Sequence, residues 1–108
     1  MAWLAVIAAG VLEVAFATML KLSDNFSRVW PTLGFIVAAA GSFSLLAWAL
    51  KELPIGSAYA VWTGIGAAGT AILGMVVFSD PVTLARITAI AMIIGGVILL
   101  NVAGTPTR

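Results

Sequence analysis

The run from Ala2 to Leu20 constrains this chain most, because its nineteen residues carry a single charged side chain, Glu13. A helix needs roughly 20 apolar residues to cross the hydrocarbon core of a bilayer. A carboxylate near the middle of such a helix costs on the order of 2.5–3.5 kcal/mol to insert. Acidic residues at that depth face a bundle interior or a water-filled cavity and mark an ion or substrate path. We therefore interpret Glu13 as functional; the alternative is a neutral acid held by a hydrogen bond to a neighbouring helix.

The composition places the whole chain in a membrane. Of its 108 residues, 63% are hydrophobic and 8% are charged, whereas soluble domains carry about 25% charged residues. The net charge of +1 gives no electrostatic basis for binding nucleic acid. Cysteine and histidine are absent, which excludes thiolate chemistry and leaves a hydrolase without an obvious base. Glu13 and Asp80 are too far apart in sequence to indicate a metal site, so we expect no enzyme, metal or cofactor.

A signal peptide is the rival interpretation of the first run. Ala15-Phe16-Ala17 resembles a small-residue cleavage site. No Lys or Arg precedes the apolar run, however, and Glu13 lies inside it, which is atypical of a signal peptide. We expect the run to be a helix of the mature protein.

Charged residues and prolines divide the chain into four apolar runs. They predict transmembrane helices over about residues 2–20, 30–50, 54–78 and 83–102, in a single four-helix domain of residues 1–108. Prolines are tolerated at helix starts and ends, and all four lie at the edges of the runs, at Pro31, Pro54, Pro81 and Pro106. The predicted fold is an all-α protein that crosses the cell inner membrane four times.

Positive charge gives this chain no preferred orientation in the membrane. With four spans, Lys21, Arg28 and Arg86 lie on one side, and Lys51, Arg108 and the terminal amine lie on the other. Three positive groups on each side leave no positive-inside bias. Either one loop decides the topology, or the protein inserts both ways up and two opposed copies pair as an antiparallel dimer with dual topology.

A dimer would also provide room for a substrate, because four helices hardly enclose an organic solute and seal it from lipid. Small residues at four-residue steps allow helices to approach closely in lipid. Such stripes occur in the third and fourth runs, at Gly56, Ala60, Gly64 and Ala68 and at Ala91 and Gly95. They suit packing within one chain or between two, and we expect at least one of them to serve a dimer.

Helical spacing predicts the surroundings of Glu13 on its own helix. Gly10, Phe16 and Ala17 lie on the same face, at i−3, i+3 and i+4. We expect Gly10 and Ala17 to leave space beside the carboxylate and Phe16 to supply an aromatic wall.

Other polar and aromatic side chains lie at a similar depth in the second and third runs. Tyr59, Trp62, Thr63 and Gly66 share one helical face, and Ser42 lies near the middle of the second run. Trp62 offers an indole N–H to a carboxylate and a π face to a cation, while Tyr59 and Ser42 offer hydroxyl donors. The alternatives are that Ser42 bonds back to the carbonyl four residues earlier and that the aromatic residues only pack.

An acid surrounded by donors and aromatic faces predicts a cation site at which a proton competes. In a bundle that opens to alternate sides, mutually exclusive occupancy of Glu13 gives proton-coupled antiport. In a dimer the two Glu13 carboxylates would titrate as a coupled pair. The sequence has no GxxxxGK[ST] motif for ATP, so the energy source would be an ion gradient.

Several motifs together resemble the small multidrug resistance family over essentially the whole chain. They are Gly10-Val11-Leu12-Glu13-Val14 followed by Lys21, then Leu53-Pro54-Ile55-Gly56, and Ala58-Tyr59-Ala60-Val61-Trp62-Thr63-Gly64-Ile65-Gly66. The form with Thr63 after Trp62 resembles the guanidinium-exporter (SugE-type) branch, since the quaternary-ammonium branch usually has Ser there.

The resemblance implies an antiparallel, dual-topology homodimer that exchanges protons for cations at Glu13. It also implies that Gly10, Ser42, Tyr59 and Trp62 line or brace the site. Two positions depart from the guanidinium branch. Phe16 stands where that branch usually has Trp, and Asn101 stands where it usually has Lys. Loss of the Trp donor would relax the site toward bulkier cations.

We therefore predict a proton-coupled antiporter that exports guanidinium-type or quaternary ammonium cations by alternating access. Its partners would be H⁺, the organic cation, membrane lipid and a second copy, although a pair of two different chains stays open. The alternatives are a non-transporting partner subunit and a passive channel. The predicted substrate- and proton-binding residues are Glu13, Gly10, Phe16, Ser42, Tyr59, Trp62 and Thr63.

Overall fold

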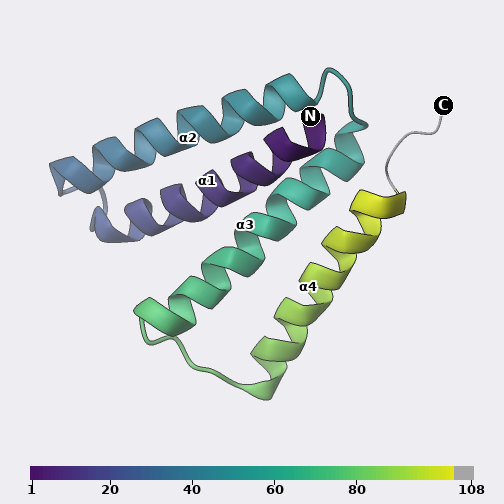
Figure 1. The fold of residues 1–108 in the computed structure, drawn as a ribbon. Helices are drawn as coiled ribbons and strands as arrows, with labels where there is room; N and C mark the ends of the chain where they lie inside the picture. Colours follow the sequence, from purple (N-terminus) through teal and green to yellow (C-terminus); the bar gives the residue numbers. More distant parts are fainter. Residues whose placement is uncertain (104–108) are drawn as a thin grey trace.

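The computed structural model describes residues 1–103 and contains four helices in that range (Figure 1). Each helix is long and apolar enough to cross a membrane, which confirms the predicted all-α fold with four spans. Their bounds are α1 (Ala2–Leu22), α2 (Val29–Ala49), α3 (Ile55–Val77) and α4 (Leu84–Ala103). Pro106 and Arg108, which follow the last predicted span, lie outside the described residues.

Local chemistry explains where some helices begin and end. Helix α1 continues two residues beyond Leu20, so that Lys21 lies in its last turn, where a cation interacts favourably with the terminal carbonyls. Pro54 directly precedes the first turn of α3. Helix α4 begins at Leu84, one residue later than expected, because the Thr83 hydroxyl accepts a hydrogen bond from the Arg86 N–H at 3.1 Å and so caps the helix.

Glycines bring helix α1 close to both of its neighbours. Helix α1 packs along α2 and α3, while α2 and α3 touch each other little. A Cβ built on Gly34 of α2 would lie 3.0 Å from Met19 Sδ, and one built on Gly69 of α3 would lie 2.6 Å from Val14 Cγ2. Close approach of this kind is how helices associate in lipid, where the hydrophobic effect supplies little attraction between them.

Helix α4 packs mainly on α3 and lies apart from α1 and α2 (Figure 1). Gly64 of the α3 stripe packs against Val97 of α4, so part of that stripe serves contacts within the chain. On α4 the stripe residues Ala91 and Gly95 are exposed. Among the described α4 side chains only Ile90 is buried.

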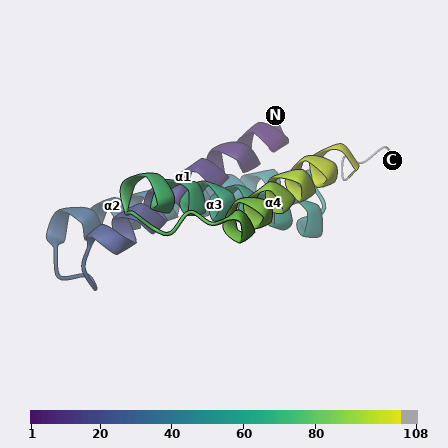
Figure 2. The same cartoon turned by 90° about the horizontal axis from the view of Figure 1, so that it is seen from below.

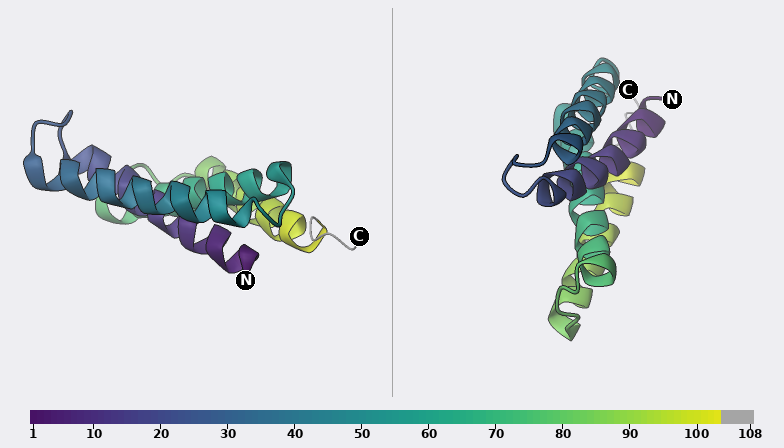
Figure 3. Two further views of the ribbon diagram at one scale, coloured as in Figure 1. Left: turned by 90° about the horizontal axis from the view of Figure 1, so that it is seen from above. Right: turned by 90° about the vertical axis from the view of Figure 1, so that its left-hand side faces the viewer.

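The four helices form a thin layer rather than a closed bundle. The Cα atoms extend over 48 × 34 × 16 Å, and the views from below, from above and from one side show how flat the arrangement is (Figures 2 and 3). A layer of this thickness has no second row of helices to cover a side chain on its faces. One chain therefore leaves the middle of α1 open on one side.

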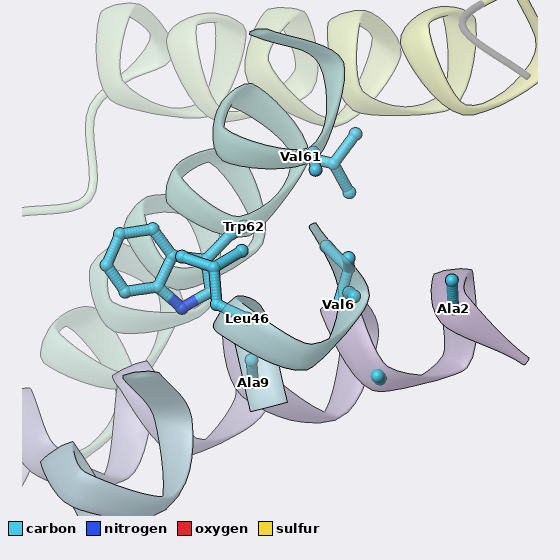
Figure 4. Close-up of a cluster of buried hydrophobic side chains, with 9 residues drawn as sticks. Ala2, Val6, Ala9, Leu46, Val61 and Trp62 are labelled. Carbon is cyan, nitrogen blue, oxygen red and sulfur yellow. The ribbon is translucent and has the colours of Figure 1, made fainter. Parts of the chain in front are cut away.

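The buried core lies at the end of the layer where α1 begins and α2 ends (Figure 4). Val6 and Ala9 of α1 meet Leu46 of α2 and Val61 and Trp62 of α3 there. Beyond Gly10, the next fully buried residue along the chain is Ser23. Glu13 therefore lies just past the well-packed part of the protein.

Candidate functional site

The Glu13 carboxyl group packs against helix α3 at Gly66. A Cβ built on Gly66 would clash with the Glu13 Cδ and Oε1 atoms, so glycine is what allows the carboxyl group to lie here. Oε1 is buried and accepts no hydrogen bond from residues 1–103. A hydrogen bond from a neighbouring helix, the alternative for this acid, is therefore absent at Oε1 within residues 1–103. A buried acceptor without a partner costs about 1–3 kcal/mol, and a bound cation that donates to it would remove that cost.

Ser42 joins the three packed helices near this carboxyl group. Its hydroxyl donates to the carbonyl oxygen of Ala9 on α1 at 2.7 Å and accepts the Trp62 indole N–H of α3 at 2.9 Å. Ser42 thus bonds across helices, and the alternative of a bond to the carbonyl four residues earlier is wrong. The Trp62 N–H that we expected to serve a carboxylate is occupied by Ser42. This network sets the rotation of α1, α2 and α3 around the site.

We expect Ser42→Ala to lower the free energy of unfolding by about 1–3 kcal/mol, because it leaves the buried Trp62 N–H without an acceptor. Ser44→Ala is the matched control, since Ser44 lies on the same helix but is exposed. Thermal unfolding in detergent measures both. Equal losses in the two variants would contradict a structural role for the Ser42 network.

Aromatic rings continue from this network along the face of α2. Phe16 contacts Phe35 edge-on, with ring centroids 5.8 Å apart, and stacks on Phe43 at 6.0 Å. Phe43 in turn lies 5.3 Å from Trp62, and Trp62 lies 5.4 Å from Tyr59. The expected aromatic wall at Phe16 therefore exists. Phe35 and Phe43 were missed, although their spacing of two helical turns places them on one face of α2.

Other predicted residues are arranged differently from what spacing implied. Gly10 is buried, and a Cβ there would lie 2.7 Å from Ile65 Cγ2. The space expected beside the carboxylate at Gly10 is thus filled by α3. The shared face of α3 is also divided. Trp62 is buried, whereas Thr63 is exposed and Tyr59 is 54% exposed, because Thr63 and Tyr59 lie at the outer edge of this shared face.

The assembled site is a membrane-embedded acid on one open face of the layer. Glu13 is half-buried, its carboxyl group rests on Gly66, and the Phe16 ring lies one turn further along α1. Ring faces attract cations, more strongly where water is excluded. The arrangement can hold a proton or an organic cation on the same carboxylate.

Comparison with known proteins identifies the family to which the chain belongs. Residues 1–93 match the family described as Small Multidrug Resistance protein. Over 103 residues the chain is 52% identical to a protein of Yersinia pseudotuberculosis serotype I (strain IP32953) named "Guanidinium exporter", covering 95% of this chain and 99% of that protein. A protein of the same name from Escherichia coli (strain K12) is 45% identical over 103 residues, which cover 95% of this chain and 98% of that one. The chain therefore belongs to the small multidrug resistance family, and it is a multi-pass protein of the inner membrane.

Proposed function

We propose that this protein is a proton-coupled antiporter that exports guanidinium-type cations by alternating access. The observation that carries the proposal is the Glu13 Oε1 atom, which is buried in a membrane-spanning helix and bonded to none of residues 1–103. Export of guanidinium is the activity in the names of its relatives from Yersinia and Escherichia coli.

Exclusive occupancy of Glu13 would couple the two fluxes. An ionised carboxylate in the hydrocarbon region is costly. The protein therefore switches the site from one side of the membrane to the other readily only when a proton or a cation neutralises the charge. A proton entering from one side displaces the cation, and a cation entering from the other side displaces the proton. Each cycle then moves the two ions in opposite directions.

We also propose an antiparallel, dual-topology homodimer. A layer 16 Å thin leaves Glu13 open on one face, and a second copy would close it. The exposed surface of α4 is available for that contact, and the balance of positive charge allows both orientations. The two Glu13 carboxylates would share the enclosed space and titrate as a coupled pair.

The aromatic surroundings favour a substrate with some hydrocarbon. Phe16 and Phe43 present two stacked rings and no N–H donor beside the acid. Phe43 is 52% exposed within one chain, so its ring can contact a substituent. We propose alkyl- or aryl-substituted guanidinium ions, and small quaternary ammonium ions, as additional substrates.

Phe16→Trp tests this specificity. We expect the ratio of guanidinium transport to phenylguanidinium transport to rise about threefold or more. The indole N–H can donate to the Glu13 carboxylate and orient it for a bare guanidinium ion, and the larger ring leaves less room for a phenyl substituent. Transport currents from reconstituted protein measure the ratio. Phe26→Trp is the control, since Phe26 lies in the loop after α1. An unchanged ratio in Phe16→Trp would remove Phe16 from the specificity determinants.

Reconstitution of the purified chain alone tests the proposed activity itself. Guanidinium added outside the vesicles should drive protons out of them, and an imposed pH gradient should drive guanidinium uptake against its own gradient. A non-transporting partner subunit would give neither response. A passive channel would give guanidinium flux that a pH gradient does not drive.

A further inference from the structure

The interface between α1 and α3 continues from Glu13 toward one end of the molecule. Glu13 meets Gly66; one turn further on lie Ala17 and Thr70, and two turns further on lie Lys21 and Gly74. These last four residues line a pocket of about 100 Å³. Thr18, Leu73, Phe78 and Asp80 complete its lining. We call it the vestibule pocket, because it lies at the end of the bundle where the α1–α2 and α3–α4 loops are.

A cation already lies against an aromatic face in the vestibule pocket. The Lys21 ammonium lies 5.4 Å from the centroid of the Phe78 ring, within the range of a cation–π contact. Phe78 comes directly after α3, and its N–H donates to the Gly74 carbonyl oxygen at 3.0 Å. This bond fixes the backbone at Phe78, so its ring stays at the end of α3 beside Lys21.

A carboxylate is folded back into the same pocket. Ser79 has a positive φ of 60°, which turns the chain so that the Asp80 N–H also bonds to the Gly74 oxygen at 3.0 Å. The Asp80 carboxylate packs directly on Gly74. Lys21 and Asp80 are the two charged residues of the lining.

Two hydroxyl groups complete a set of acceptors. The Thr18 hydroxyl donates to the Val14 carbonyl oxygen at 2.8 Å, so its own oxygen remains an acceptor, and Thr70 contributes another hydroxyl. Guanidinium presents N–H donors around a plane. An aromatic face, a carboxylate and hydroxyl acceptors are thus together in one small pocket of about 100 Å³.

We infer that the vestibule pocket is a second site for a small planar cation, on the path between Glu13 and the loop end of the molecule, and that the Lys21 ammonium occupies it as a tethered competitor. This inference rests on the proposed export function. A cation leaving Glu13 displaces Lys21 from Phe78, pauses beside Asp80, and is expelled when the lysine returns. The pocket is too small for a bulky quaternary ammonium ion, so only the small planar substrates pause there.

Direct binding in a chain without the main site tests the inference. The probe is guanidinium chloride at millimolar concentration, titrated calorimetrically into purified protein. Glu13→Gln should bind no guanidinium, because Lys21 fills the vestibule. Glu13→Gln with Lys21→Met should bind it, and further addition of Asp80→Asn should weaken that binding by about tenfold. Glu13→Gln with Arg28→Gln is the control, since Arg28 is exposed at the same end and its loss changes the net charge equally.

Each outcome of this titration decides one question. Binding that appears with Lys21→Met but not with Arg28→Gln supports the second site. Absence of binding in the Lys21→Met variant, or equal binding in both, overturns it. Guanidinium binding by Glu13→Gln alone overturns the role of Lys21 as a competitor if Asp80→Asn weakens that binding, and contradicts the proposed function if Asp80→Asn leaves it unchanged, so the two failures are distinguishable.

Transport kinetics supply an independent test in the otherwise intact chain. Lys21→Met should lower the guanidinium concentration for half-maximal transport about two- to fivefold, the factor that corresponds to one exposed cation–π contact. Lys21→Arg keeps the charge and the stacking and should retain the original value. Lys21→Met combined with Asp80→Asn should lose the gain, since the two residues act on one site. A gain that persists in the double variant, or that Arg28→Gln reproduces, would overturn the inference.

Discussion

Glu13→Gln should abolish the proposed proton-coupled guanidinium transport and leave membrane insertion and dimer assembly intact. The amide does not ionise, so it neither takes up nor releases a proton, and it carries no charge to hold a cation; both ligands of the proposed cycle lose their site. The variant keeps the shape of the side chain that packs on Gly66 and adds no charge to the bilayer interior, so folding is preserved. Proteoliposomes loaded with a pH indicator measure the proton flux, and cross-linking in membranes measures assembly.

Glu52→Gln is the matched control for this experiment. Glu52 is exposed in the turn between α2 and α3, so the same chemical change there should leave transport at its original rate. Transport by Glu13→Gln at more than about a tenth of the original rate would refute the central role of this carboxylate. Loss of activity in both variants would indicate a general sensitivity to lost negative charge rather than a single site.

The spans of this protein could be predicted from the sequence because the bilayer imposes strong rules. A chain in lipid must satisfy every backbone hydrogen bond internally, so a long apolar run has little choice but a helix. Pro31 and Pro54 lie where helices begin, and Lys51 and Glu52 lie in the short turn between two spans. Length, charge and proline thus sufficed to identify four helices.

The contacts between the helices could not be predicted in the same way. In a soluble bundle the apolar face identifies the buried face, but in lipid the outward face is apolar as well. The sequence therefore contained little information on how each helix is rotated. Ser42 was recognised as a polar residue at the right depth, yet its partners, Ala9 and Trp62, depend on that rotation. For the same reason Gly10 was expected to line a space that Ile65 fills.

Gly66→Ala should reduce guanidinium affinity and transport by about tenfold or more, because the added methyl group occupies the position of the Glu13 carboxyl group. A Cβ at residue 66 would clash with the Cδ and Oε1 atoms of Glu13. The Glu13 carboxylate must then move away from α3, and the displaced acid loses its orientation toward a bound cation. A change of 1.36 kcal/mol in binding or in a barrier corresponds to a factor of ten, and displacing a packed group costs about 1–3 kcal/mol. Guanidinium titration and transport currents measure the two effects.

Gly56→Ala separates this steric effect from the general effect of alanine in a helix. Both glycines lie in α3, and alanine favours a helix by about 1 kcal/mol over glycine at either position. A Cβ at residue 56, however, meets no atom within 4 Å, so this variant should transport normally and unfold at the same or a higher temperature. Normal transport by Gly66→Ala would show that the Glu13 carboxylate does not need to pack on Gly66 of α3 to function. Inactivation of both variants would show instead that α3 must stay flexible, and that its glycines act through the backbone rather than through contact with the acid.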